Sequence, residues 1–88
     1  MDDPVPSQVA VELRRVLQRW QQLPLEDALV RMPLVRAEVT ELAGQDVPDL
    51  GPAVILDQLS VVVFDAAAAG AEPEELHDRL VRLRRALA

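Results

Sequence analysis

PAVILDQLSVVVFDAAAA, residues 52–69, is the stretch of this sequence that decides the fold. Its run of apolar side chains is interrupted only by Asp57, Gln58, Ser60 and Asp65. A helix on the surface of a globular protein needs a full polar face, which this stretch lacks. We therefore expect residues 52–69 to form the most buried helix of a small bundle, covered on most sides and in part by a second chain.

The segment 8–22 is predicted to form an amphipathic helix. Its apolar side chains recur at helical spacing on one arc, while Glu12 and several arginines occupy the opposite arc. Ser7 can serve as the N-cap of this helix. Residues 1–7 then form a flexible lead-in, and residues 8–88 form a single domain.

Residues 25–43 are predicted to form the second helix even though Pro33 lies inside it. Proline removes a backbone hydrogen bond and normally breaks or kinks a helix. The apolar side chains keep one continuous phase across Pro33, which favours one helix, kinked at this residue, over two short ones. The side chains in this phase, which we expect in the core, are Leu25, Leu29, Met32, Val35, Val39 and Leu42.

Residues 73–87 are predicted to form the fourth helix, which begins at Pro73. Its acidic residues precede its arginines, an order that complements the helix dipole. Leucines lie on one narrow seam of this helix at positions 76, 80, 83 and 87. Four helices, joined by short connections and by the loop 44–52, predict an all-α, antiparallel up-down-up-down four-helix bundle.

The composition limits the possible functions. Nine basic residues, all of them arginine, stand against 15 acidic ones, and the formal net charge of −6 argues against a general nucleic-acid binder. The absence of cysteine excludes disulfides and thiolate chemistry. The longest apolar run is too interrupted to span a bilayer, and residues 1–6 do not resemble a signal peptide. We therefore expect a cytoplasmic protein with no membrane contact.

No residue pattern in the sequence points to catalysis or to a cofactor. The few hydroxyl side chains and the single His77 do not form a pattern typical of nucleophilic catalysis. Glu74 and His77 have the E-x-x-H spacing of di-metal sites in helical bundles, but that chemistry needs a second such motif and further glutamates. We therefore expect that the protein is not an enzyme and binds no cofactor or metal. The alternative is a metal-binding helical bundle that uses Glu74 and His77.

Spare apolar side chains predict a surface for a protein partner. Val54 and Val61 point away from the main apolar arc of residues 52–69, where Asp57 and Asp65 surround them. Gathered apolar residues mark an interface, and a two-fold homodimer is the commonest way to cover one. We expect a small interaction or regulatory protein that acts through helix surfaces, with itself and an unidentified protein as partners. The 52–69 or the 73–87 helix would lie at the symmetry axis. Further apolar side chains off the core stripes are Val11, Val30, Leu34 and Val81.

Arg14, Arg15 and Arg19 predict a small basic patch on the 8–22 helix, because only Glu12 lies near them in the sequence. This patch supports a further alternative, a regulator that associates with nucleic acid. The candidate partner surface comprises Val54, Val61, Asp57, Asp65, Arg14, Arg15 and Arg19.

Overall fold

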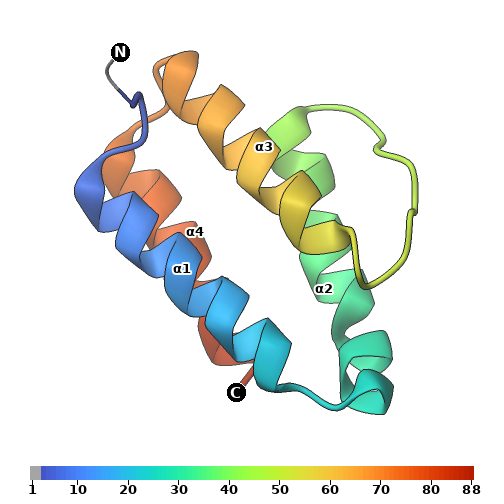
Figure 1. Ribbon diagram of the computed structural model, residues 1–88. Coiled ribbons are helices and arrows are strands. Elements are labelled where there is room, and N and C mark those ends of the chain that lie inside the picture. Colours follow the sequence, from blue (N-terminus) through green and yellow to red (C-terminus); the bar gives the residue numbers. More distant parts are fainter. Residues whose placement is uncertain (1–2) are drawn as a thin grey trace.

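The computed structural model describes residues 3–88, which form four α-helices and the segments that join them (Figure 1). The helices are α1 (Ser7–Gln22), α2 (Leu25–Ala43), α3 (Ile55–Ala68) and α4 (Pro73–Ala86). No strand occurs in residues 3–88, so the all-α fold class is confirmed for this part of the chain. None of these helices combines the length and the apolar character that a membrane span requires. Met1 and Asp2, in the predicted flexible lead-in, lie outside the described residues.

The bundle consists of two closely packed helix pairs. α1 packs along α4, α2 packs along α3, and contacts between α2 and α4 join the two pairs. α1 and α3 touch only weakly, so the bundle closes less tightly along the seam between them. The largest fully buried side chains of the core are Ile55, Leu59, Leu76, Leu80, Leu87, Val9, Val16, Val35, Val39 and Val63.

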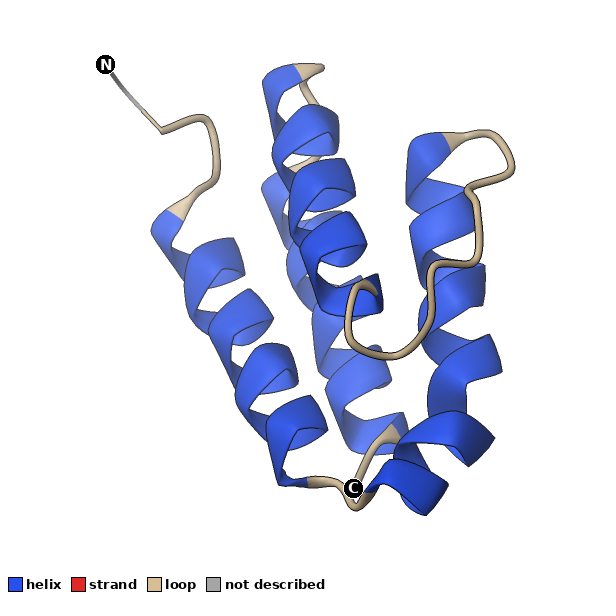
Figure 2. Ribbon diagram, turned by 45° about the vertical axis from the view of Figure 1, so that its right-hand side comes forward, coloured by secondary structure: helices blue, strands red, loops and turns tan. Residues whose placement is uncertain are grey.

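The direction of α3 differs from that in the predicted up-down-up-down bundle. Trp20, near the end of α1, donates a hydrogen bond from Nε1 to the Pro52 carbonyl oxygen just before α3 (3.2 Å). Arg19 Nε donates to the Leu87 carbonyl oxygen at the end of α4 (2.9 Å). The end of α1 therefore lies beside the start of α3 and the end of α4. As a result, α1 runs parallel to α4 and α2 runs parallel to α3, in up-down-down-up order (Figure 1, Figure 2).

Residues 44–54 make this topology possible because they cross from one end of the bundle to the other. A segment of about 11 residues can span about 36 Å when extended, whereas a helix of 14 residues such as α3 is about 21 Å long. Two side chains hold the crossover against the bundle. Arg36 donates to the Val47 carbonyl oxygen (3.2 Å), and Gln58 donates to the Pro48 carbonyl oxygen (3.0 Å).

The ends of the helices follow the predicted signals only in part. Gly44 ends α2 as expected: its φ is +71°, and its N–H donates to the carbonyl oxygens of Thr40 and Glu41. Ser7 is not an N-cap, because α1 begins at Ser7 itself and no side chain caps its first turn. α3 begins three residues later than predicted, because residues 52–54 form a turn closed by the Gly51 carbonyl oxygen.

α2 runs without interruption through Pro33, as predicted for one helix, and the kink at Pro33 remains a prediction. The expectation that Leu25 and Leu29 belong to the core is wrong, since they are 66% and 52% exposed. Ala28 takes the inward position at the start of α2, and Leu29 lies about 100° farther around the helix. The buried side chains of α2 are Ala28, Met32, Val35 and Val39.

α3 buries more residues than any other helix, yet it is not covered on most sides. Its outer side leaves Val61 58% exposed and Phe64 47% exposed. The apolar surplus that the sequence places in α3 is therefore open to solvent in the single chain. Its buried side chains are Ile55, Leu56, Leu59, Val62 and Val63.

Candidate functional site

A groove runs along the weakly closed seam between α1 and α3, the two helices in front in Figure 1. Two hollows of about 540 and 280 Å³ lie along it, and both are lined by Leu17 of α1 and Ser60 of α3. We call this surface the α1–α3 groove. Its principal lining side chains are Leu13, Leu17, Trp20, Leu56, Ser60 and Phe64.

Helical spacing brings these side chains to the two walls of the groove. Leu13 and Leu17 are four residues apart on α1, and Ser60 and Phe64 are four apart on α3, so each pair shares a helix face. Ser60 Oγ donates a hydrogen bond to the Leu56 carbonyl oxygen within its own helix (3.0 Å). The middle of the groove therefore has a small side chain whose hydroxyl group is already hydrogen-bonded.

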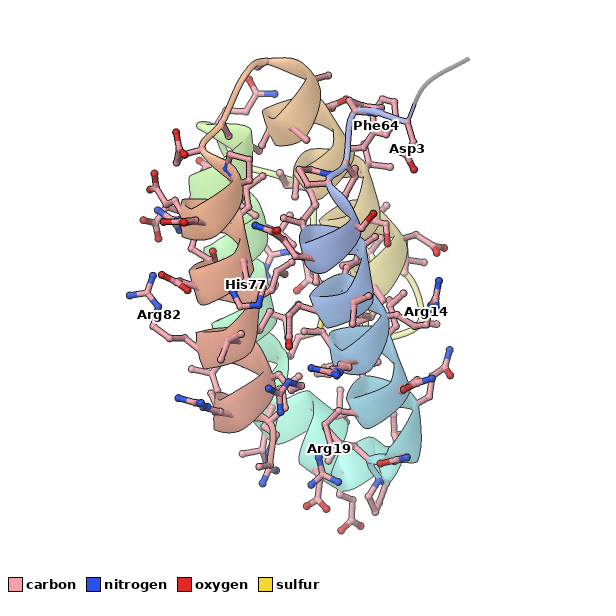
Figure 3. The ribbon with its side chains drawn as sticks, turned by 90° about the vertical axis from the view of Figure 1, so that its left-hand side faces the viewer. Asp3, Arg14, Arg19, Phe64, His77 and Arg82 are labelled. Atoms are coloured by element: carbon pink, nitrogen blue, oxygen red, sulfur yellow. The ribbon has the colours of Figure 1, made fainter. Side chains whose placement is uncertain are left out.

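The only two aromatic residues of the protein line this groove. Trp20 lines one half, where its indole is 8% exposed and held by the hydrogen bond to Pro52. Phe64 lines the other half and is 47% exposed, near Asp3 in Figure 3. Aromatic side chains are enriched among the residues that contribute most to protein–protein binding. The groove thus offers one fixed and one accessible aromatic contact.

The groove carries charges of both signs: Arg14 and the exposed Asp3 line one hollow, and Asp57 lines the other. Arg14 lies on the α1 rim and Asp57 on the α3 rim, and both are exposed. Neither has an ion-pair partner among residues 3–88. Figure 3 shows Arg14 projecting outward from α1. Both charged groups are thus available to a partner seated in the groove.

The fold engages the other two arginines of the predicted basic patch. Arg15 Nη1 donates to Glu12 Oε1 (2.7 Å), and Arg19 Nε donates to the Leu87 carbonyl oxygen at the end of α4 (2.9 Å). Only Arg14 keeps its guanidinium free of such contacts within the described chain. One free arginine on α1 gives the nucleic-acid alternative little support, because that affinity comes from neutralising several phosphates.

Glu12 is buried, although the sequence pattern predicted it on the solvent side of its helix. It is 3% exposed, and its carboxylate accepts hydrogen bonds from Arg15 and from Arg84 Nε of α4 (3.0 Å). Burial alone would raise the pKa of Glu12, but the hydrogen bonds and charges of Arg84 and Arg15 outweigh burial and hold the pKa below its ordinary value of 4.5. This carboxylate joins α1 to α4, so its role is structural.

The structure divides the predicted partner surface on α3 between two places. Asp57 lines the α1–α3 groove, whereas Val61 and Asp65 line a separate hollow of about 440 Å³ between α2, α3 and the crossover. Val54 is partly buried just before α3 begins. The three-arginine patch and the α3 residues therefore do not form one site, and only Arg14 and Asp57 line a common surface.

A second apolar surface lies on the outer side of α2. Val30 and Leu34, which the sequence pattern placed off the core stripe, are 76% and 47% exposed. They share the outer face with the exposed Pro33 and Ala37 at i, i+3, i+4 and i+7 spacing. We call Val30, Pro33, Leu34 and Ala37 the α2 stripe. This spacing is visible in the sequence, and reading it as a second face would have found the stripe.

Glu74 and His77 gain no support as metal ligands. Within residues 3–88, no group of three or more histidine, aspartate or glutamate side chains is placed to hold a metal ion. Glu74 is exposed, and His77 Nδ1 lies 3.4 Å from Asp78 Oδ1 of the same helix. His77 lies on α4 in Figure 3, and this carboxylate is its hydrogen-bonding neighbour.

No protein-family model, no curated protein and no solved structure matches this chain.

Proposed function

We propose that this chain is a small, non-enzymatic protein-interaction module of the cytoplasm, which acts through helix surfaces and works as a homodimer. The observation that carries the proposal is the α2 stripe. Val30 and Leu34 lie on one outer face with Pro33 and Ala37, opposite the buried side of the helix. Apolar residues gathered on one face, unlike scattered ones, mark an interaction surface.

A second copy is a suitable cover for the α2 stripe. No charged side chain lies within the stripe; Glu26 and Glu41 lie beyond its two ends. Pro33 and Ala37 are small enough for two helices to approach closely. In an isologous contact, α2 of one copy packs on α2 of the other, so the same surface is used on both copies. Such a contact forms a dimer and cannot extend into a longer chain of copies.

The leucine seam of α4 is less suited to the symmetry axis. Leu76, Leu80 and Leu83 are at most 6% exposed, because they face the core of the single chain. We therefore propose α2 for the symmetry axis, in place of α3 or α4, which the sequence pattern suggested. A stable interface buries about 800 Å² on each partner, more than one helix face offers, so we expect a dimer of micromolar strength.

Light scattering over a range of micromolar concentrations tests the dimer. We expect the mass to rise toward that of two chains, and Val30→Glu to return it to one chain because an unpaired charge then lies within the apolar stripe. Val11→Glu makes the same change on α1, where Val11 is 43% exposed, and should leave the dimer intact. A wild-type mass of one chain at every concentration would contradict the homodimer.

A further inference from the structure

We propose that the α1–α3 groove binds an amphipathic helix of a partner protein. This inference rests on the proposed function in assuming that the chain acts through helix surfaces, but it does not require the homodimer. α1 belongs to one tightly packed pair and α3 to the other, so the seam between them is open. A helix laid along this seam would contact both walls, as amphipathic helices do in apolar grooves.

The groove has the dimensions of a short helix. Its walls are α1, with 16 residues, and α3, with 14 residues or about 21 Å, and Leu23, Leu25 and Ala28 line one end. A partner helix of about four turns would extend over both halves of the groove. Ser60 lines both hollows, and its small side chain lies between the half lined by Trp20 and the half lined by Phe64.

The rims specify the charges of the partner. A helix whose apolar side faces Ser60 would bring its two flanks against Arg14 on one side and Asp57 on the other. Complementarity requires acidic side chains on the flank beside Arg14, and basic side chains on the flank beside Asp57 and at the end of the groove beside Asp3. Because both rim groups are exposed, we expect them to set specificity more than affinity, which the apolar contacts supply.

The test uses the full chain and a synthetic helical peptide of about 14 residues, matching the length of α3. The peptide carries leucines on one face, glutamates on one flank and arginines on the other. We expect saturable binding, a change in the fluorescence of Trp20, and amide shifts confined to the residues of α1 and α3 that line the groove. A peptide with glutamates on both flanks should bind at least about twofold more weakly.

Three variants of the groove sharpen the test. Ser60→Arg should abolish binding by filling the middle of the groove, and Phe64→Ala should weaken it about tenfold by removing an accessible aromatic contact. Arg14→Glu makes both rims acidic, so it should shift the preference to a peptide with arginines on both flanks. Val30→Glu on the α2 stripe is the matched control and should leave peptide binding unchanged even if it abolishes the dimer. Circular dichroism verifies that each variant is folded.

The possible outcomes separate the groove from the dimer. The groove proposal would be overturned by any of three results. These are peptide binding that does not reach saturation, binding to the Ser60→Arg and Phe64→Ala variants as tight as binding to the wild-type protein, and amide shifts centred on α2. A fall in the mass of the unliganded protein caused by Ser60→Arg would also overturn it, because the groove would then be occupied by a second copy. Peptide binding by a protein that is monomeric at every concentration would support the groove and contradict only the homodimer.

Discussion

Glu12 is buried by contacts that cannot be predicted from the residue pattern of its own helix. Its neighbours in the sequence placed it on the polar arc of α1, yet it is 3% exposed and accepts a hydrogen bond from Arg84, 72 positions away. A buried carboxylate is stable only when its charge is paired and its oxygens are hydrogen-bonded. Arg84 and Arg15 meet both requirements, so Glu12 helps to specify how α1 and α4 pack.

Replacing Glu12 by Gln is expected to lower the free energy of unfolding by about 1–3 kcal/mol at pH 7, because two charge-assisted hydrogen bonds are weakened. The folded-state pKa of Glu12 lies below 4.5, so its contribution is complete above that value and is lost as the pH falls through the folded-state pKa. Urea unfolding should show the difference between wild type and variant shrinking in acid. Glu26→Gln, at an exposed position, is the control, and a difference that is constant with pH would contradict the prediction.

Each helix has an inward and an outward face, and the neighbouring helices determine which of its apolar residues are buried. α3 turns Leu59 inward and leaves Val61 outward, although both are apolar and lie two positions apart. α4 is joined to α2 by Arg79, whose guanidinium donates to Glu38 (2.9 Å) and Glu41 (2.8 Å). The hydrogen bond from Arg79, and then its positive charge, lower the pKa of Glu41. Ion pairs thus secure the side of the bundle opposite the α1–α3 groove.

Leu59→Ala is expected to lower the free energy of unfolding by about 2–5 kcal/mol, because Leu59 is fully buried and its truncation leaves a cavity. Val61→Ala, on the outer face of the same helix, should change it by less than about 0.5 kcal/mol. Denaturant titration followed by circular dichroism measures both. Equal effects of the two substitutions would mean that α3 is rotated about its axis.

At the scale of the whole molecule, the crossover 44–54 sets the relative directions of the helices. It returns the chain to the end of the bundle where α2 began, so that α2 and α3 run parallel (Figure 2). The two pairs α1/α4 and α2/α3 then meet through α2 and α4 on one side and leave the α1–α3 groove on the other. The candidate site is therefore a consequence of the topology.

Spin labels can verify this topology, because the chain contains no cysteine that would interfere. Glu26 and Ala53 lie near the starts of α2 and α3, and Ala68 lies at the end of α3; all three are exposed. Cysteine pairs at 26/53 and 26/68 should give a distance that is about 10–15 Å shorter for the first pair, since the second adds the length of α3 to the spacing between the helices. In an up-down-up-down bundle the order of the two distances would be reversed.

The candidate site was only partly visible in the sequence. Arg14 and Asp57 were recognised as candidate partner residues, as were Val30 and Leu34 as spare apolar positions. The groove itself was not recognised, because Leu17 and Ser60 come together only through the packing of α1 and α3. The sequence pattern places Leu25 and Leu29 in the core because helical periodicity does not show which of two adjacent arcs faces inward.

The four helices, their approximate bounds and the all-α class can be predicted from the sequence alone. These features depend on local signals: helical periodicity, the proline after Leu23, and Gly44. Each signal affects only residues nearby in the sequence, so it can be recognised without knowing the fold. The direction of α3, the burial of Glu12 and the groove between α1 and α3 follow only from the tertiary packing. Each of these depends on contacts between residues far apart in the chain, and the crossover 44–54 is long enough to permit either direction of α3.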